Sequence, residues 1–220
     1  MSHLHLPDGV VPVWLWAPAL LLVLVLLALS NRSATPQTVA YQGALGGLML
    51  AAMAIPLGPL DYHLTLAGPV GILLGAAGAF PVVFVASAIL AFLGHGGLTS
   101  VGLNTLMLGG AAAVSRGAFF LLVRRLGPAW AMALASAAGQ VVAALLWIGI
   151  VGITLGLAPR TAALTKAAPR LELLAGLALV LWIVGTLIES VVAFGIGRFL
   201  ARVHPALLPA LAAAPAEEAA

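Results

Sequence analysis

The chain has 220 residues, of which 63% are hydrophobic and only 7% are charged, and its nine basic and six acidic residues give a formal net charge of +3. Because a soluble domain has about 25% charged residues, this composition excludes a water-soluble globule and indicates a polytopic membrane protein. The basic residues are too few and too scattered for a nucleic-acid-binding surface.

Seven long apolar stretches follow one another along the chain, and a membrane helix needs roughly 20 apolar residues. We therefore expect an all-α bundle of about seven transmembrane helices. It forms a single membrane-embedded domain over residues 1–208, with an N-terminal arm at 1–10 and a short tail at 209–220. The third and fourth stretches meet at Phe80-Pro81 and fit either a tight helical hairpin or one broken helix. The expected spans are 11–30, 39–56, 65–80, 82–94, 103–124, 130–157 and 173–200.

The first stretch could be taken for a signal peptide. No basic residue precedes it, however, and its apolar run is longer than a usual signal-peptide core, so we interpret it as a retained helix.

Seven crossings then place the termini on opposite sides of the membrane. Five basic residues against three favour an external N-terminus and a cytoplasmic C-terminus. The five are Arg32, Arg124, Arg125, Arg198 and Arg202, and the three are Arg160, Lys166 and Arg170.

The histidines gather on one side of the membrane by the same count. His3 and His5 precede the first helix, His63 follows the second and His95 follows the fourth. An even number of crossings separates these positions, so all four are expected on one face. His204 falls on the opposite face and is interpreted as a solvated tail residue.

The N-terminus can provide a chelate made entirely of nitrogen. The chain has no cysteine, so a metal must bind nitrogen or oxygen ligands. If Met1 is kept, its amine, the amides of Ser2 and His3 and the His3 imidazole make four ligands. If Met1 is removed, the Ser2 amine and the His3 amide and imidazole make three, and His63 or His5 completes the square. Such a planar set suits Ni(II) or Cu(II), with Co(II) also acceptable, and binding must displace protons, so affinity should fall at low pH.

Taken alone, this N-terminal pattern is weak, because exposed terminal histidines are most often simply solvated. Two features strengthen the metal-binding interpretation. His63 is expected on the same face as the N-terminus, and Pro7-Asp8-Gly9 has turn chemistry that can fold the arm back over the bundle.

Several other chemistries are excluded or disfavoured. The sequence has no GxxxxGK[ST] phosphate loop and no HExxH helix. The glycines around His95, in the segment 94–99, predict a sharp turn, and His95 is interpreted as a loop residue rather than a ligand. Arg116 and Glu189 are the ionisable residues inside the predicted helices, where charge is costly, and a structural ion pair between them is one possibility.

Small residues line one face of the second predicted helix at spacings of three and four. Such patterns let membrane helices approach closely. Internal packing is the simpler interpretation, and a face that docks a partner membrane protein is the alternative. The residues are Ala40, Gly43, Ala44, Gly47, Ala51 and Ala54.

Four motifs occur in the order found in one known family. The chain resembles the cobalt/nickel substrate-binding (S) components of energy-coupling factor transporters, the CbiM/NikM family, over about residues 3–208. The motifs are His5-Leu6-Pro7-Asp8-Gly9, then His63-Leu64-Thr65 with Gly68 and Gly71 to Gly75, then Gly94-His95-Gly96-Gly97-Leu98-Thr99 with Asn104 and Gly109, and finally Gly185 to Glu189 with Arg202 to Leu208.

This resemblance implies a seven-helix S component in the cell inner membrane whose N-terminus tucks into the bundle and binds Ni²⁺ or Co²⁺, the metal supplied for cobalamin biosynthesis among other uses. It implies a transmembrane coupling (T) protein, two cytoplasmic ATPases and a small accessory membrane protein as partners, and no cofactor. Alignment of the motif favours His5 as the N-terminal ligand, whereas chelate geometry favours His3. The expected ligands are therefore Met1, Ser2, His3, His5 and His63, and Asn104 and His95 are expected to support them, Asn104 by hydrogen bonding to the arm.

Two other functions fit the sequence less well. A stand-alone secondary metal transporter or exporter would need an ion-coupling site, and acidic residues inside the membrane are almost absent. An intramembrane metalloenzyme would need a general base close to the metal. Glu189, the carboxylate inside the predicted helices, is far along the chain from the histidines, so we expect a non-catalytic transporter subunit.

Overall fold

The structure is a computed structural model that describes residues 6, 8–55, 63–156 and 162–209, with the side chains of residues 33 and 162–178 outside the description. The described part of the chain is all-helical, as expected from its composition. The α-helices are α1 (Val13–Ser30), α2 (Pro36–Ala54), α3 (Ala67–Phe92), α4 (Val101–Gly156) and α5 (Ala162–Val203), and the short 3-10 turns are η1 (Asn31–Ser33) and η2 (Pro205–Leu207).

Four helical segments are long and apolar enough to cross a membrane, among the residues that the structure describes. They are Val13–Ser30, Ala67–Phe92, Val101–Gly156 and Leu179–Val203. Large apolar side chains such as Leu121, Phe92 and Val191 are more than 70% exposed. Such a surface would be a liability in water and suits contact with lipid, so the chain is a multi-pass membrane protein.

The described residues form five helices, so the expected count of seven separate helices is not confirmed. The predicted pair 65–80 and 82–94 corresponds to α3, and the pair 103–124 and 130–157 corresponds to α4, each of which consists of two helical segments joined at a kink. Each is interrupted by one glycine, at Gly75 (φ 80°, ψ 166°) and Gly127 (φ 72°, ψ 168°). Since essentially only glycine adopts this backbone region, the chain changes direction at these two residues.

The interruption expected at Phe80-Pro81 is also misplaced. Pro81 lies inside the second half of α3 and its neighbours keep helical backbone angles. A proline removes one helical hydrogen bond but its fixed φ still fits a helix, whereas the positive φ of Gly75 ends the helical path outright. The glycine therefore decides where α3 breaks.

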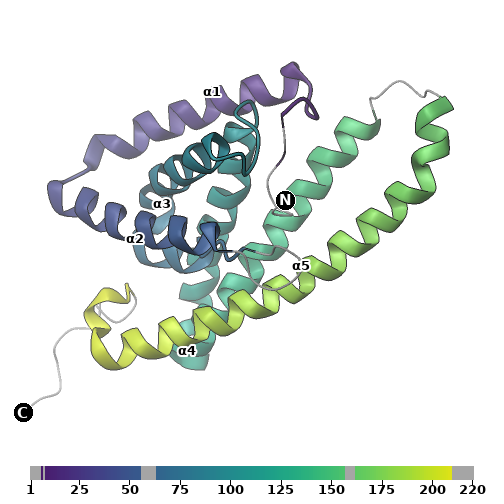
Figure 1. Cartoon of the computed structure of the whole chain (residues 1–220). Helices are drawn as coiled ribbons and strands as arrows, with labels where there is room; N and C mark the ends of the chain where they lie inside the picture. The colour runs from purple at the N-terminus through teal and green to yellow at the C-terminus, as the bar shows by residue number, and fades with distance from the viewer. Residues whose placement is uncertain (1–5, 7, 56–62, 157–161, 210–220) are drawn as a thin grey trace, which may run out of the picture.

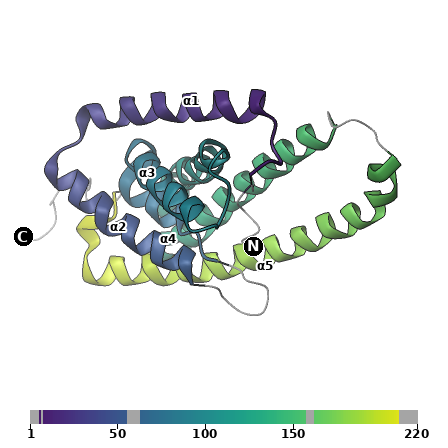
Figure 2. The ribbon, with the colours of Figure 1, turned by 45° about the horizontal axis from the view of Figure 1, so that its top comes forward.

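The helices are arranged around α3 and α4, which pack most extensively against each other. α2 packs on α3, α1 packs on α3 and α4, and α5 packs on α4. In Figures 1 and 2, α1 crosses one side of the molecule and α5 runs along the opposite side, while the C-terminal end of α4 and the N-terminal end of α5 extend away from the other helices. A buried apolar cluster joins α2, α3 and α4, with Met49, Met53, Val83, Leu90 and Leu108 among its members.

Candidate metal centre

His63 and His95 lie against each other although α3 separates them in the sequence. Their ring centroids are 5.5 Å apart with the planes at 89°, and His63 is only 5% exposed. A straight helix of the length of α3 would hold its two ends about 39 Å apart. The break at Gly75 turns the chain back, so the two ends of α3 meet and the two imidazoles share one face of the molecule, as expected from the sequence.

His95 lies in a tight turn between α3 and α4. Gly94 and Gly96 have positive φ angles of 81° and 112°, and the His95 N–H donates to the Leu90 carbonyl at 2.8 Å. The sharp turn expected from the glycines is therefore present. The His95 Nδ1 atom is buried and has no hydrogen-bond partner among the described residues. Buried ring nitrogens normally have a polar or metal partner.

The N-terminal arm is fixed to the same turn at Leu6. The Leu6 N–H donates to Asn104 Oδ1 at 3.0 Å, and the Leu6 carbonyl accepts from the Gly97 N–H at 2.9 Å. Asn104 is 1% exposed, and Leu6 is 2% exposed. The Leu6 side chain packs with Val11 and Leu103 in a buried apolar cluster. Burial of this one side chain contributes about 2 kcal/mol to the stability of the fold. The arm therefore folds inward at residue 6, next to the turn that carries His95.

Asp8 makes a second attachment between the arm and this turn. Its Oδ1 accepts from the Thr99 hydroxyl at 2.6 Å and the Thr99 N–H at 2.8 Å, and its Oδ2 accepts from the Leu98 N–H at 3.0 Å. These hydrogen bonds, first those from Thr99 and then that from Leu98, hold the pKa of Asp8 below its ordinary value of 3.8 against a small opposing effect of burial. Asp8 is exposed, so this attachment is in contact with solvent.

A buried polar cluster holds the segment that leads from His63 into α3. Thr65, Gln140 of α4 and Glu189 of α5 are each 3% exposed or less. Glu189 accepts from the Thr65 N–H at 2.6 Å, the Thr65 hydroxyl at 3.0 Å and Gln140 Nε2 at 2.6 Å. We name these three residues the Thr65–Gln140–Glu189 cluster. It fixes the start of α3 to the two helices that follow.

The ion pair considered between Arg116 and Glu189 is not the arrangement found. Arg116 donates to the Ile72 carbonyl at 2.7 Å and its guanidinium lies 5.1 Å from the centroid of the Phe120 ring. The Ile72 carbonyl lies just before the break at Gly75, where the helical hydrogen bonds end. Arg116 therefore donates to a carbonyl near the end of a helical segment, while Glu189 accepts hydrogen bonds from Thr65 and Gln140.

Four of the expected ligands, Met1, Ser2, His3 and His5, lie outside the described residues. In the part of the chain that the structure describes, no three histidine, cysteine, aspartate or glutamate side chains are grouped so that they could hold a metal ion. The described residues bring together two imidazoles, of His63 and His95, and the arm that leads to His5. His204 is exposed at the end of α5, as expected.

The importance of Thr65 and Gln140 was missed in the sequence analysis. The available signal was a set of polar side chains inside apolar spans, because such groups need partners in a membrane. Gln140 of α4 and Glu189 of α5 are such side chains, but the opposite charges of Arg116 and Glu189 pointed to a different pair.

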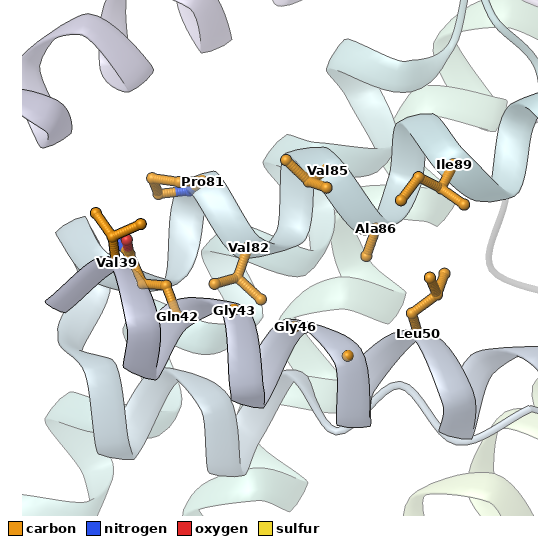
Figure 3. A pocket seen from close by; sticks show the side chains of 11 residues that line it. Val39, Gln42, Gly43, Gly46, Leu50, Pro81, Val82, Val85, Ala86 and Ile89 are labelled. Atoms are coloured by element: carbon orange, nitrogen blue, oxygen red, sulfur yellow. The ribbon is translucent and has the colours of Figure 1, made fainter. Parts of the chain in front are cut away.

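A groove between α2 and α3 lies apart from the histidines. Gly43, Gly46 and Gly47 of α2 line it, and Figure 3 shows Val82, Val85 and Ile89 of α3 along its other wall. Gln42, the polar side chain in this lining, donates to the Gly78 carbonyl at 2.9 Å. The lining is otherwise almost wholly apolar, so the small residues leave an open furrow on this side of α2.

Comparisons with known proteins give one matching family and two similar structures. The chain matches the CbiM family, described as the cobalt uptake substrate-specific transmembrane region, over residues 5–207. It is similar to a crystal structure of a truncated transition metal transporter, with a TM-score of 0.74 and 21% identity over 90% of this chain and 98% of that one. A second crystal structure of a transition metal transporter gives a TM-score of 0.75 and 21% identity over 90% and 93%. No curated protein matches the chain.

Proposed function

This chain belongs to the CbiM family, the substrate-specific transmembrane region of cobalt uptake, and from that premise we propose that it binds Ni²⁺ or Co²⁺ and passes the ion inward as the S component of an ATP-driven energy-coupling factor transporter. The observation that carries this proposal is the attachment of Leu6 to Gly97 and Asn104. It brings the arm to the turn whose His95 contacts His63.

The proposed ligands combine the arm with His63. Leu6 is fixed to the turn at 94–100, and the first residues of the chain precede it in the sequence. Their amine, amide and imidazole nitrogens, from Met1 or Ser2 and from His3 or His5, would complete an all-nitrogen set with the His63 imidazole. Such a set is planar and accepts either Ni²⁺ or Co²⁺. His95 is proposed to orient the His63 ring against which it lies, and Asn104 to fix the arm.

The energy for transport is proposed to come from other subunits. We infer a transmembrane coupling protein and two cytoplasmic ATPases, joined by a small accessory membrane protein, with the N-terminus external and the C-terminus cytoplasmic. The groove between α2 and α3 is the proposed contact with the coupling protein, because small residues let a partner helix approach closely in lipid (Figure 3). The chain itself is proposed to carry out no catalysis.

The proposal is tested by metal binding to the purified protein with an unmodified N-terminus. His63→Ala should lower the affinity for Ni²⁺ or Co²⁺ at least about tenfold, because it removes one imidazole ligand from the set. Equilibrium dialysis with metal analysis measures this. The matched control is His204→Ala, which removes an exposed histidine at the end of α5 that is not among the proposed ligands and should leave the affinity unchanged. Equal affinity of His63→Ala and wild type would remove His63 from the site.

The docking groove has a separate test. Gly43→Leu would fill the furrow, since a Cβ at Gly43 meets no atom within 4 Å. It should weaken co-purification with the coupling protein while metal affinity stays the same. Gly149→Leu is the matched control, because Gly149 also lies in open space, on α4. Undiminished co-purification of Gly43→Leu would place the contact elsewhere.

A stand-alone secondary transporter is the second candidate. Uptake or export of metal by this polypeptide alone, in energised vesicles without ATPases, would favour it. The described residues offer Glu189 as a buried carboxylate, and it is occupied by Thr65 and Gln140, so nothing in the geometry favours ion coupling over dependence on partner subunits.

A further inference from the structure

Both the hydroxyl and the backbone N–H of Thr65 are hydrogen-bonded inside the protein. Its hydroxyl donates to Glu189 Oε2 at 3.0 Å and accepts from Gln140 Nε2 at 2.8 Å and from the Ala67 N–H at 3.3 Å. A hydroxyl has one donor and two acceptor sites, so its full capacity is used. The Thr65 N–H is also bound, by Glu189 Oε1 at 2.6 Å. Both the backbone and the side chain of Thr65 are therefore fixed in place.

The residue after Thr65 is strained. Leu66 has φ 52° and ψ 16°, and it is the one non-glycine residue with positive φ in the described part of the chain. A branched side chain is disfavoured in this left-handed region, and such strain persists where the surroundings over-determine it, often at functional sites. Residues 63–65 precede α3, and the turn at Leu66 sets the direction in which they enter it. His63 lies two residues before the fixed Thr65.

We propose that Glu189 and Gln140 are positioning residues for the metal centre. They act through Thr65. The Glu189 carboxylate and the Gln140 amide hold Thr65 and the strained turn at Leu66, and this fixes the His63 imidazole at its place beside His95. The inference rests on the proposed function, in which His63 is a ligand of the metal. A buried carboxylate inside a membrane is costly and is retained mainly where it has a function.

Exchange of the two side chains gives the sharpest test. Glu189→Gln puts two amides together and leaves one donor without an acceptor, and Gln140→Glu brings two carboxylates together. Each should weaken Ni²⁺ affinity about tenfold, as supporting residues around metal ligands do. The double variant Glu189→Gln with Gln140→Glu again has one carboxylate and one amide around Thr65. Its affinity should return to within about threefold of wild type.

The neighbouring Ser190→Ala is the matched control for these variants. The Ser190 hydroxyl donates to the Thr186 carbonyl of its own helix, so its removal should leave the affinity unchanged. Unchanged affinity in Glu189→Gln would overturn the proposal, and so would a double variant that binds as weakly as the single ones.

A milder pair covers the case in which Glu189→Gln does not fold. Thr65→Val removes the hydroxyl but keeps the N–H bond to Glu189, and should weaken affinity about threefold. Thr105→Val removes an equally buried hydroxyl that donates to the Val101 carbonyl of its own helix, and should have no effect. Equal affinity of the two valine variants would contradict the proposal.

A measurement without metal separates this inference from the proposed function. In the metal-free protein, side-chain NMR of ¹⁵N-labelled histidine should show shifted or broadened His63 signals in Glu189→Gln, and wild-type signals in the double variant and in Ser190→Ala. Identical His63 spectra in wild type and Glu189→Gln would overturn the positioning role even if metal binds. Wild-type protein that binds neither Ni²⁺ nor Co²⁺ would overturn the proposed function, while the histidine spectra still decide the role of Glu189 and Gln140.

Discussion

Two of the attachments at the candidate metal centre are made by carboxylates, and they differ in their surroundings. The Thr65–Gln140–Glu189 cluster fixes the segment that carries His63 and is buried inside the helices, with Glu189 2% exposed. The Asp8 attachment fixes the arm to Leu98 and Thr99 and is exposed. Among the described residues each carboxylate accepts three hydrogen bonds, Glu189 from Thr65 and Gln140 and Asp8 from Leu98 and Thr99.

The two attachments use similar hydrogen bonds, but their difference in burial changes how much free energy it costs to break them. A buried donor that loses its acceptor has no water to replace it, so breaking the buried cluster is expensive. Water can replace the partners of an exposed carboxylate, so the Asp8 bonds open at little cost. The Asp8 bonds are therefore the weaker of the two carboxylate attachments, while the buried bonds of Leu6 to Asn104 and Gly97 keep the arm at the turn.

The largest effect is expected when the buried attachment is broken. Glu189→Leu removes the acceptor of the Thr65 N–H and one of the two acceptors of Gln140 Nε2, and should lower the free energy of unfolding by about 2 kcal/mol. Denaturant titration in detergent measures it. Asp8→Ala removes as many hydrogen bonds, and its loss should be clearly smaller. Equal losses in the two variants would abolish the distinction between the attachments.

The next effect concerns the arm itself. A short uncleaved extension at the N-terminus removes the free amine at its expected position and crowds the arm, and should lower Ni²⁺ affinity about tenfold, with stability almost unchanged. Dialysis against Ni²⁺ measures the affinity, and the same extension at the C-terminus is the control. Normal binding by the N-terminally extended protein would show that the amine is not a ligand.

The smallest effect is expected from protonation of Asp8. Its pKa is lowered in the folded protein by hydrogen bonds from Thr99 and Leu98, so its contribution is fully present above 3.8 and is lost as the pH falls through the lower folded value. Hydrogen exchange of the Leu98 and Thr99 amides should therefore accelerate below about pH 3.8 relative to the amides of α3. Asp8→Asn should remove this pH dependence. An unchanged profile in Asp8→Asn would assign the acceleration to another group.

The sequence predicts the apolar helices and the shared face of His63 and His95 better than the contacts that hold these segments together. Apolar stretches reveal the helices because a membrane requires long apolar runs, and even crossings place His63 and His95 on one face. The break at Gly75 is not predictable in this way, because glycine is frequent throughout the chain and only the packing shows which one adopts positive φ. The partner of Glu189 was missed for a similar reason. Thr65 and Gln140 are neutral residues, and the opposite charge of Arg116 suggested a pair that the fold does not bring together.

The central claim is that the beginning of the chain and His63 enclose a divalent ion in nitrogen ligands. The most direct test is metal analysis together with the visible absorption spectrum of Ni²⁺-loaded protein with an unmodified N-terminus. We predict one Ni²⁺ per chain and the absorption band of planar four-nitrogen Ni(II), lost in His63→Ala. A spectrum of octahedral, oxygen-rich Ni(II), or a planar band that survives in His63→Ala, would contradict the claim.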